Sequence, residues 1–87
     1  LEIRVGNSKI MMYGGTWCSD CKRAKRFFDQ HKIQYEWVDL DKNNDALDYV
    51  KRLNNGRRVI PTIVFGDGSI LVEPTDAQLA EKTSEIL

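Results

Sequence analysis

The chain has 87 residues, enough for one domain and close to the smallest size at which a single hydrophobic core is stable alone. Hydrophobic residues make up 41% of it, so the sequence is typical of a globular protein rather than a disordered one. The 13 Lys and Arg residues balance the 13 Asp and Glu residues, which argues against binding to nucleic acid or to an anionic membrane. We therefore predict a single domain over residues 1–87.

Cysteine content and hydropathy limit where such a protein works. The chain has two cysteines, too few for the disulfide framework of a small secreted domain. Its apolar runs are far shorter than a membrane span, and no signal-peptide pattern opens it. We therefore expect a cytoplasmic, monomeric protein in a reducing compartment, with no membrane or nucleic-acid partner.

The first half of the chain has the pattern of a strand, a helix and a second strand. Residues 3–5 form at most a short leading strand, and the continuous apolar run at 10–13 predicts a strand buried on both faces. Residues 19–31 repeat apolar side chains at the spacing of an amphipathic helix. A strand at 33–39 follows, so the two long strands should be parallel, with a right-handed crossover.

The next elements are a helix and a hairpin. Asn44 is a suitable N-cap for a helix over 44–53, and Asn-Gly at 55–56 is a suitable stop. Strands at 62–65 and 70–72 flank a glycine-rich turn, a pattern typical of a β-hairpin.

A capping box opens the last predicted element. Thr75 and Gln78 have the spacing in which each side chain satisfies a backbone N–H of the other, and the helix should run to about residue 86. The complete order is β-α-β-α-β-β-α, which belongs to the α/β class.

The two cysteines, Cys18 and Cys21, lie three residues apart at the start of the first helix. Such positions are about 5–6 Å apart between Cβ atoms, and a disulfide needs roughly 3.5–4.5 Å, so a small adjustment opens or closes the bond. The free N–H groups and the dipole of a helix start favour a thiolate. We predict a thiol–disulfide exchange centre, with Cys18 at the solvent end as nucleophile and Cys21 on the buried stripe as resolving thiol.

A zinc site is the main alternative for a Cys-x-x-Cys pair. A structural zinc site needs four nitrogen or sulfur ligands. Besides the two cysteines, the chain offers one histidine, His31. It lies ten residues, about three turns, beyond Cys21 on the same predicted helix, so its imidazole cannot reach both thiols. We therefore predict no metal site.

Two charged residues near Cys18 act in opposite directions. Asp20 disfavours a nearby thiolate, whereas Lys22 favours it. Asp20 can also be simply an acidic residue in a first helical turn, where it interacts favourably with the helix dipole. The sequence leaves both readings open.

From residue 9 to the C-terminus the sequence resembles the glutaredoxins. The features that carry the resemblance are the element order, Trp17-Cys18-x-x-Cys21, Ile60-Pro61 before the third strand, and the hairpin that leads into the last helix. The resemblance implies a thioredoxin-like fold in which a four-stranded mixed sheet is flanked by three helices.

Within that family the sequence is most similar to the mycoredoxin branch. The similarity lies in segment 65–71 followed by Glu73-Pro74. Members that use glutathione usually carry Gly-Gly in place of Glu73-Pro74, and Pro-Tyr in place of Ser19-Asp20. Both departures bear on which small thiol the protein uses.

The resemblance implies an enzyme that reduces protein disulfides or mixed disulfides through its two cysteines. Its electrons would come from a low-molecular-weight thiol, mycothiol or glutathione, acting as co-substrate, with no tightly bound cofactor. It also implies a cis bond before Pro61, which leaves the Ile60 backbone free to pair with an extended thiol peptide. The residues assigned to thiol or substrate binding are Trp17, Arg58, Ile60, Pro61, Thr75 and Asp76.

Three of these assignments have simpler alternatives. Arg58 can bind a carboxylate through a bidentate fork, or can be a solvated base after a helix. Thr75 and Asp76 lie at a helix N-terminus that can bind an anion, and both also suit simple capping.

Two functions of other classes fit the same pattern. One is an electron-donor redoxin that a flavin disulfide reductase, such as thioredoxin reductase, reduces directly. The other is a non-catalytic module that senses redox state or holds an iron–sulfur cluster between two copies. Cluster-holding members tend to have a single active cysteine, so Cys21 argues against the second.

Overall fold

The computed structural model describes residues 9–86, and the strand predicted at 3–5 lies outside them. The elements in chain order are β1 (Met11–Gly14), α1 (Ser19–Gln30), β2 (Glu36–Asp39), the 3-10 helix η2 (Leu40–Lys42), α2 (Asn44–Leu53), β3 (Thr62–Val64), β4 (Ile70–Val72) and α3 (Asp76–Ile86). The predicted order is confirmed, with η2 as an addition after β2.

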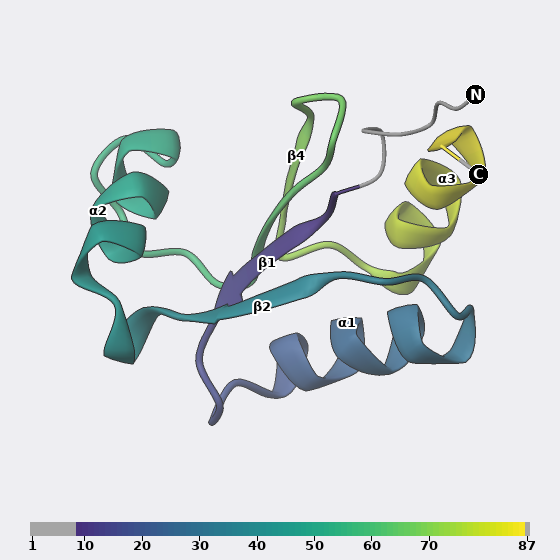
Figure 1. The fold of residues 1–87 in the computed structure, drawn as a ribbon, viewed down its shortest axis with the longest axis horizontal. Helices are drawn as coiled ribbons and strands as arrows, with labels where there is room; N and C mark the ends of the chain where they lie inside the picture. Colours follow the sequence, from purple (N-terminus) through teal and green to yellow (C-terminus); the bar gives the residue numbers. More distant parts are fainter. Residues whose placement is uncertain (1–8, 87) are drawn as a thin grey trace.

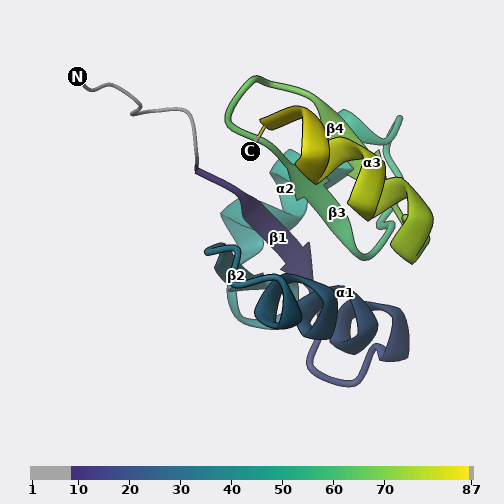
Figure 2. The same ribbon diagram turned by 90° about the vertical axis from the view of Figure 1, so that its right-hand side faces the viewer.

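A four-stranded mixed sheet with the order β2-β1-β3-β4 forms the centre of the fold. β1 is parallel to β2, as predicted, and antiparallel to β3, which pairs in turn with β4. Helices α1 and α3 lie on one side of the sheet and α2 lies on the other (Figures 1 and 2). This arrangement is the predicted thioredoxin-like fold.

Alternation along β1 divides the hydrophobic core into two layers. Met12 packs on the side of α1 and α3, together with Ile63, its partner on β3. Tyr13 points to the opposite side and packs with Leu40 and Val50 beneath α2. The larger cluster consists of Ile10, Met12, Ala24, Phe27, Phe28, Ile33, Ile63, Phe65 and Leu79. Because both faces of β1 are buried, the strand holds the segment that follows it firmly.

Several predicted boundaries differ from the structure: β3 ends at Val64 rather than at residue 65, α1 ends at Gln30 rather than at residue 31, and β1 and β2 are shifted. β2 begins at Glu36 rather than at residue 33, because the Ile33 N–H bonds to the Phe28 carbonyl at 2.9 Å and its side chain is buried in the core. These residues therefore close α1 instead of extending the sheet. β1 covers Met11–Gly14 rather than 10–13, since Gly14 still pairs with Asp39 of β2.

The predicted N-cap of α2 was wrong by one residue. Asn43, not Asn44, is the cap, and its Oδ1 accepts a hydrogen bond from the Ala46 N–H at 3.0 Å. The unpredicted helix η2 precedes it and is capped by Asp39, whose Oδ1 accepts from the Asp41 N–H at 2.9 Å.

The capping box of α3 is confirmed. The Gln78 N–H donates to Thr75 Oγ1 at 3.1 Å, and the Thr75 N–H donates to Gln78 Oε1 at 2.8 Å. Over residues 9–86, no helix combines the length and apolar character that crossing a bilayer requires.

Candidate active site

Cys18 is the N-cap of α1. Its backbone is extended (φ −84°, ψ 118°), and its Sγ accepts a hydrogen bond from the Cys21 N–H at 3.1 Å. The sulfur thus occupies the position that a Ser or Asp oxygen takes at most helix starts. Cys18 is buried, with 7% of the residue exposed, whereas the sequence placed its thiol at the solvent end of the helix.

Cys21 lies one turn further, and its side chain is fully buried. Burial, with a smaller contribution from its hydrogen bond to Cys18, raises the pKa of Cys21 from 9.0 to about 12. The expected inequivalence of the two thiols is therefore present in the structure. Cys18 and Cys21 are not joined by a disulfide in this structure.

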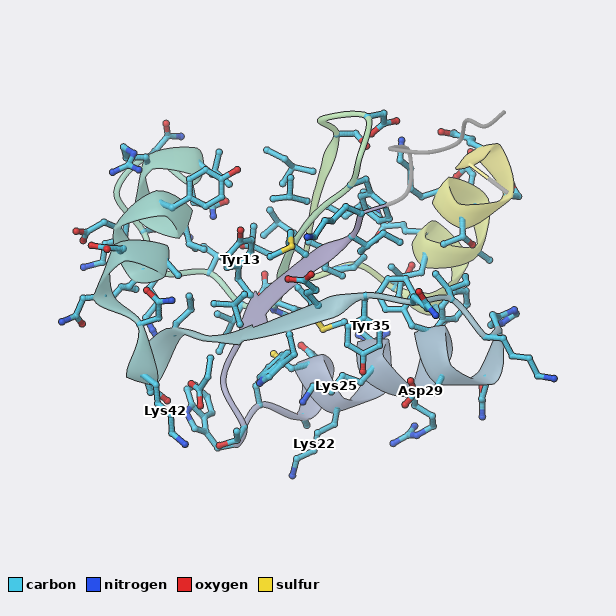
Figure 3. All side chains as sticks on the ribbon, in the orientation of Figure 1. Tyr13, Lys22, Lys25, Asp29, Tyr35 and Lys42 are labelled. Atoms are coloured by element: carbon cyan, nitrogen blue, oxygen red, sulfur yellow. The ribbon has the colours of Figure 1, made fainter. Side chains whose placement is uncertain are left out.

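Gly14, the last residue of β1, gives Cys21 its space. A Cβ at this position would lie 2.5 Å from Cys21 Sγ and 2.9 Å from the Trp37 ring. Lys25 Nζ lies 3.5 Å from the centroid of the Trp37 ring. Lys22, by contrast, extends away from the ribbon (Figure 3). The indole and the strand end together enclose the buried thiol. Neither Gly14 nor Trp37 was among the predicted site residues.

The peptide bond between Ile60 and Pro61 is cis, as the resemblance implied. Pro61 is buried, and its carbonyl accepts a hydrogen bond from the Glu73 N–H at 2.9 Å. A second hydrogen bond spans the cis peptide bond: Thr62 Oγ1 donates to the Val59 carbonyl at 2.7 Å. Hydrogen bonds therefore hold this loop from both ends and tie it to the segment before α3.

Glu73 has a left-handed backbone, with φ of +49°. A side chain there is strained, which explains physically why a glycine suits this position in relatives that carry Gly-Gly. Pro74, the next residue, is buried. The Glu73-Pro74 pair therefore combines a left-handed residue that carries a carboxylate with a buried proline.

Arg23 of α1 joins the Cys-x-x-Cys segment to the start of α3. Its Nη1 lies 3.0 Å from Asp76 Oδ1, and its Nη2 lies 3.4 Å from Asp20 Oδ1. The same Nη2 donates to the Pro74 carbonyl at 3.2 Å. Asp76, predicted to bind a thiol cofactor, and Asp20, whose role the sequence left open, are thus both paired with Arg23. Arg23 was not among the predicted site residues.

A second ion pair lies on the other side of the cysteines. Trp17 is 61% exposed, and its Nε1–H donates to Asp41 Oδ2 at 3.0 Å. Arg58 Nη2 donates to Asp41 Oδ1 at 2.8 Å, and the guanidinium carbon lies 5.5 Å from the centroid of the Trp17 ring. The structure therefore brings together Trp17 and Arg58, two predicted binding residues, through a carboxylate that the sequence did not single out.

Contacts join the predicted site residues into separate groups. Trp17 and Arg58 form one group through Asp41, and Asp76 belongs to another through Arg23. Thr75 is used as a cap. Among residues 9–86, no group of three or more His, Cys, Asp or Glu side chains is arranged to hold a metal ion.

A β-α-β-α-β-β-α domain with a Cys-x-x-Cys pair opening α1 and a cis-proline before β3 is a thioredoxin-like dithiol protein. The glutaredoxin family model matches residues 10–70. The chain belongs to the glutaredoxin family.

Individual relatives agree with this family. Over 77 residues the chain is 34% identical to a candidate glutaredoxin of Mycobacterium tuberculosis, covering 88% of this chain and 92% of the relative. It is 29% identical over 75 residues to mycoredoxin 1 of Corynebacterium glutamicum, covering 86% and 92%. The crystal structure of a glutaredoxin from Archaeoglobus fulgidus matches with a TM-score of 0.70 at 22% identity, covering 98% of this chain and 95% of that one.

Proposed function

We propose that the protein is a dithiol oxidoreductase that reduces protein disulfides or mixed disulfides and is recharged by a low-molecular-weight thiol. The observation that carries this proposal is the position of Cys18 Sγ as the N-cap of α1, directly beside the buried Cys21. A sulfur at a helix N-terminus receives hydrogen bonds and a favourable dipole that stabilise its negative charge. The thiolate is the form that attacks a disulfide.

The proposed reaction transfers two electrons in two exchange steps. Cys18 thiolate attacks one sulfur of the substrate disulfide, so a mixed disulfide forms and the other sulfur leaves as a thiolate. Cys21 or a small thiol then attacks Cys18, and the second substrate thiol is released. The raised pKa of Cys21 keeps this thiol protonated in the resting site, which supports Cys18 as the first nucleophile; Cys21 loses its proton only as it attacks the mixed disulfide.

Two parts of the site support binding of the substrate. The Ile60 backbone before Pro61 can pair with an extended peptide that carries the disulfide, because proline leaves that stretch without its own N–H. The exposed Trp17 ring directly before Cys18 offers apolar surface to the same substrate. The reaction belongs in a reducing compartment such as the cytosol.

Substituting each cysteine tests the assignment of roles. We expect Cys18→Ser to abolish disulfide reduction, because it removes the attacking sulfur. Cys21→Ser should accumulate a mixed disulfide at Cys18 and retain activity toward small mixed disulfides. Mass spectrometry after exposure to a disulfide substrate measures both outcomes. An active Cys18→Ser protein alongside an inactive Cys21→Ser protein would reverse the roles.

The source of electrons is tested separately. If a small thiol recharges the protein, turnover of a disulfide substrate should require that thiol. Turnover with thioredoxin reductase and its reductant alone, without a small thiol, would instead identify an electron-donor redoxin.

A further inference from the structure

Asp41 is the acceptor that joins two separate parts of the site. Its Oδ2 accepts from the indole of Trp17 at 3.0 Å, and its Oδ1 accepts from the guanidinium of Arg58 at 2.8 Å. Each carboxylate oxygen therefore has a different partner. The indole lies directly before Cys18, so this carboxylate is one side chain away from the reacting sulfur.

The backbone of Asp41 is held by the fold. Asp41 is the central residue of η2, and its N–H bonds to Asp39 Oδ1 at 2.9 Å. Leu40, the residue before it, is buried in the core beneath α2. These two contacts fix the start of the carboxylate side chain, so that Arg58 and Trp17 are ordered against it.

The ion pair changes what Arg58 offers to a ligand. A free guanidinium binds a carboxylate of a small thiol through two parallel hydrogen bonds. Arg58 already donates to a carboxylate of its own chain, which neutralises its charge. An incoming carboxylate must therefore displace Asp41 or lie beside it as a like charge. The other arginine of the site, Arg23, is likewise paired, with Asp20 and Asp76.

We propose that Asp41 is a specificity-determining residue that disfavours thiols carrying carboxylates by keeping Arg58 paired. This inference rests on the proposed function and names the class of small thiol and disulfide that the site accepts. That class carries no carboxylate beside Arg58, because an uncharged thiol leaves the pair of Arg58 and Asp41 in place. The exposed face of Trp17 supplies the apolar surface beside it.

Single-turnover oxidation of the reduced protein tests the inference without any recharging thiol. Each reduced protein gives two electrons to one small disulfide, which yields a Cys18–Cys21 disulfide and two small thiols. Three substrates form a charge series: glutathione disulfide is anionic, bis(2-hydroxyethyl) disulfide is neutral and cystamine is cationic. The second-order rate constant for each, divided by that for the neutral substrate, isolates the effect of charge.

Asp41→Asn keeps the size of the side chain and removes its charge. We expect the relative rate constant for glutathione disulfide to rise about tenfold, since one charge-assisted hydrogen bond from Arg58 becomes available. The relative rate constant for cystamine should fall. In the double variant Asp41→Asn/Arg58→Gln the gain for glutathione disulfide should disappear. Asp48→Asn, an equal substitution at an exposed position of α2, should change neither ratio.

The possible failures are distinguishable. Unchanged ratios in Asp41→Asn, with a wild type that reduces all three disulfides, overturn the inference and leave the proposed function standing. A gain that persists in the double variant also overturns it, because the effect then does not pass through Arg58. A wild type that reduces none of the three disulfides overturns the proposed function and this inference together.

Discussion

At the scale of single residues, the site depends on Gly14 having no side chain. Gly14 ends β1 at the point where Cys21 Sγ and the Trp37 ring both approach the backbone. A pair of thiols can change its spacing only if the strand end leaves that space open. The glycine is therefore part of the redox site, although it carries no reactive group.

Replacing Gly14 by alanine should destabilise the protein. The added Cβ would lie 2.5 Å from Cys21 Sγ, and both this sulfur and the Trp37 ring belong to packed surroundings. Overpacking of this kind costs about 1–3 kcal/mol of unfolding free energy, which urea denaturation measures. Gly15→Ala is the matched control. Its Cβ would meet the exposed ring of Trp17, which can move aside, so a similar loss in both variants would contradict the explanation.

Sequence reasoning placed the cysteine pair at the start of α1, where the structure has it, and missed the residues around the pair. Cys18 and Cys21 were predictable because their spacing and their place at a helix start are local. Asp41 and Arg23 were not, because their partners are distant in sequence: Asp41 is 24 residues from Trp17, and Arg23 is 53 residues from Asp76. Only the complete fold brings such charges together.

At the scale of elements, the turn between β3 and β4 is linked to α3. Lys82 of α3 donates to Asp67 Oδ2 at 2.8 Å, and the N–H and hydroxyl of Ser69 donate to Asp67 Oδ1 at 2.9 and 2.6 Å. These bonds hold the pKa of Asp67 well below its ordinary value of 3.8, with the bond from Lys82 as the largest cause. The ionised carboxylate therefore favours the folded state.

This linkage gives a pH dependence with a defined sign. A carboxyl whose pKa is lower in the folded state stabilises the protein above its unfolded pKa and loses that contribution as the pH falls. Asp67→Asn should therefore lower Tm at neutral pH, and the difference from the wild type should close as the pH falls below about 4. Thermal unfolding at a series of pH values measures the difference. A gap that stays constant down to about pH 2 would assign the effect to something other than ionisation.

Local sequence signals predicted the elements better than their ends. The capping box of Thr75 and Gln78 and the glycine turn of the hairpin are short-range devices, and both were found where predicted. The cap of α2 was misplaced because two asparagines stand side by side, and only the geometry after η2 selects Asn43. η2 itself depends on the burial of Leu40 against α2, which no local pattern reveals.

At the scale of the whole molecule, the formal net charge is zero, so the arrangement of charged side chains around the cysteines decides the local charge. Near the cysteines, Arg23 and Arg58 are both paired with acidic side chains of the chain itself. Glu73 adds a further carboxylate next to the loop that contains Pro61. We therefore expect the site to prefer a substrate that carries little negative charge of its own. The sequence departures at Glu73-Pro74 indicated this preference, and the pairing of both arginines supports it.

The preference for a substrate with little negative charge can be measured by comparing kcat/KM for two mixed disulfides that have the same leaving thiol. Because glutathione carries two carboxylates and mycothiol presents sugar hydroxyls, we expect a higher kcat/KM with the mycothiol substrate. Glu73→Gly/Pro74→Gly should improve use of glutathione about tenfold, since it removes a charge and lets the backbone approach the ligand. Glu73→Gln isolates the charge, and a smaller gain there would assign the rest to the backbone. Equal or better use of glutathione by the wild type would contradict the mycothiol preference and leave a glutathione-using glutaredoxin.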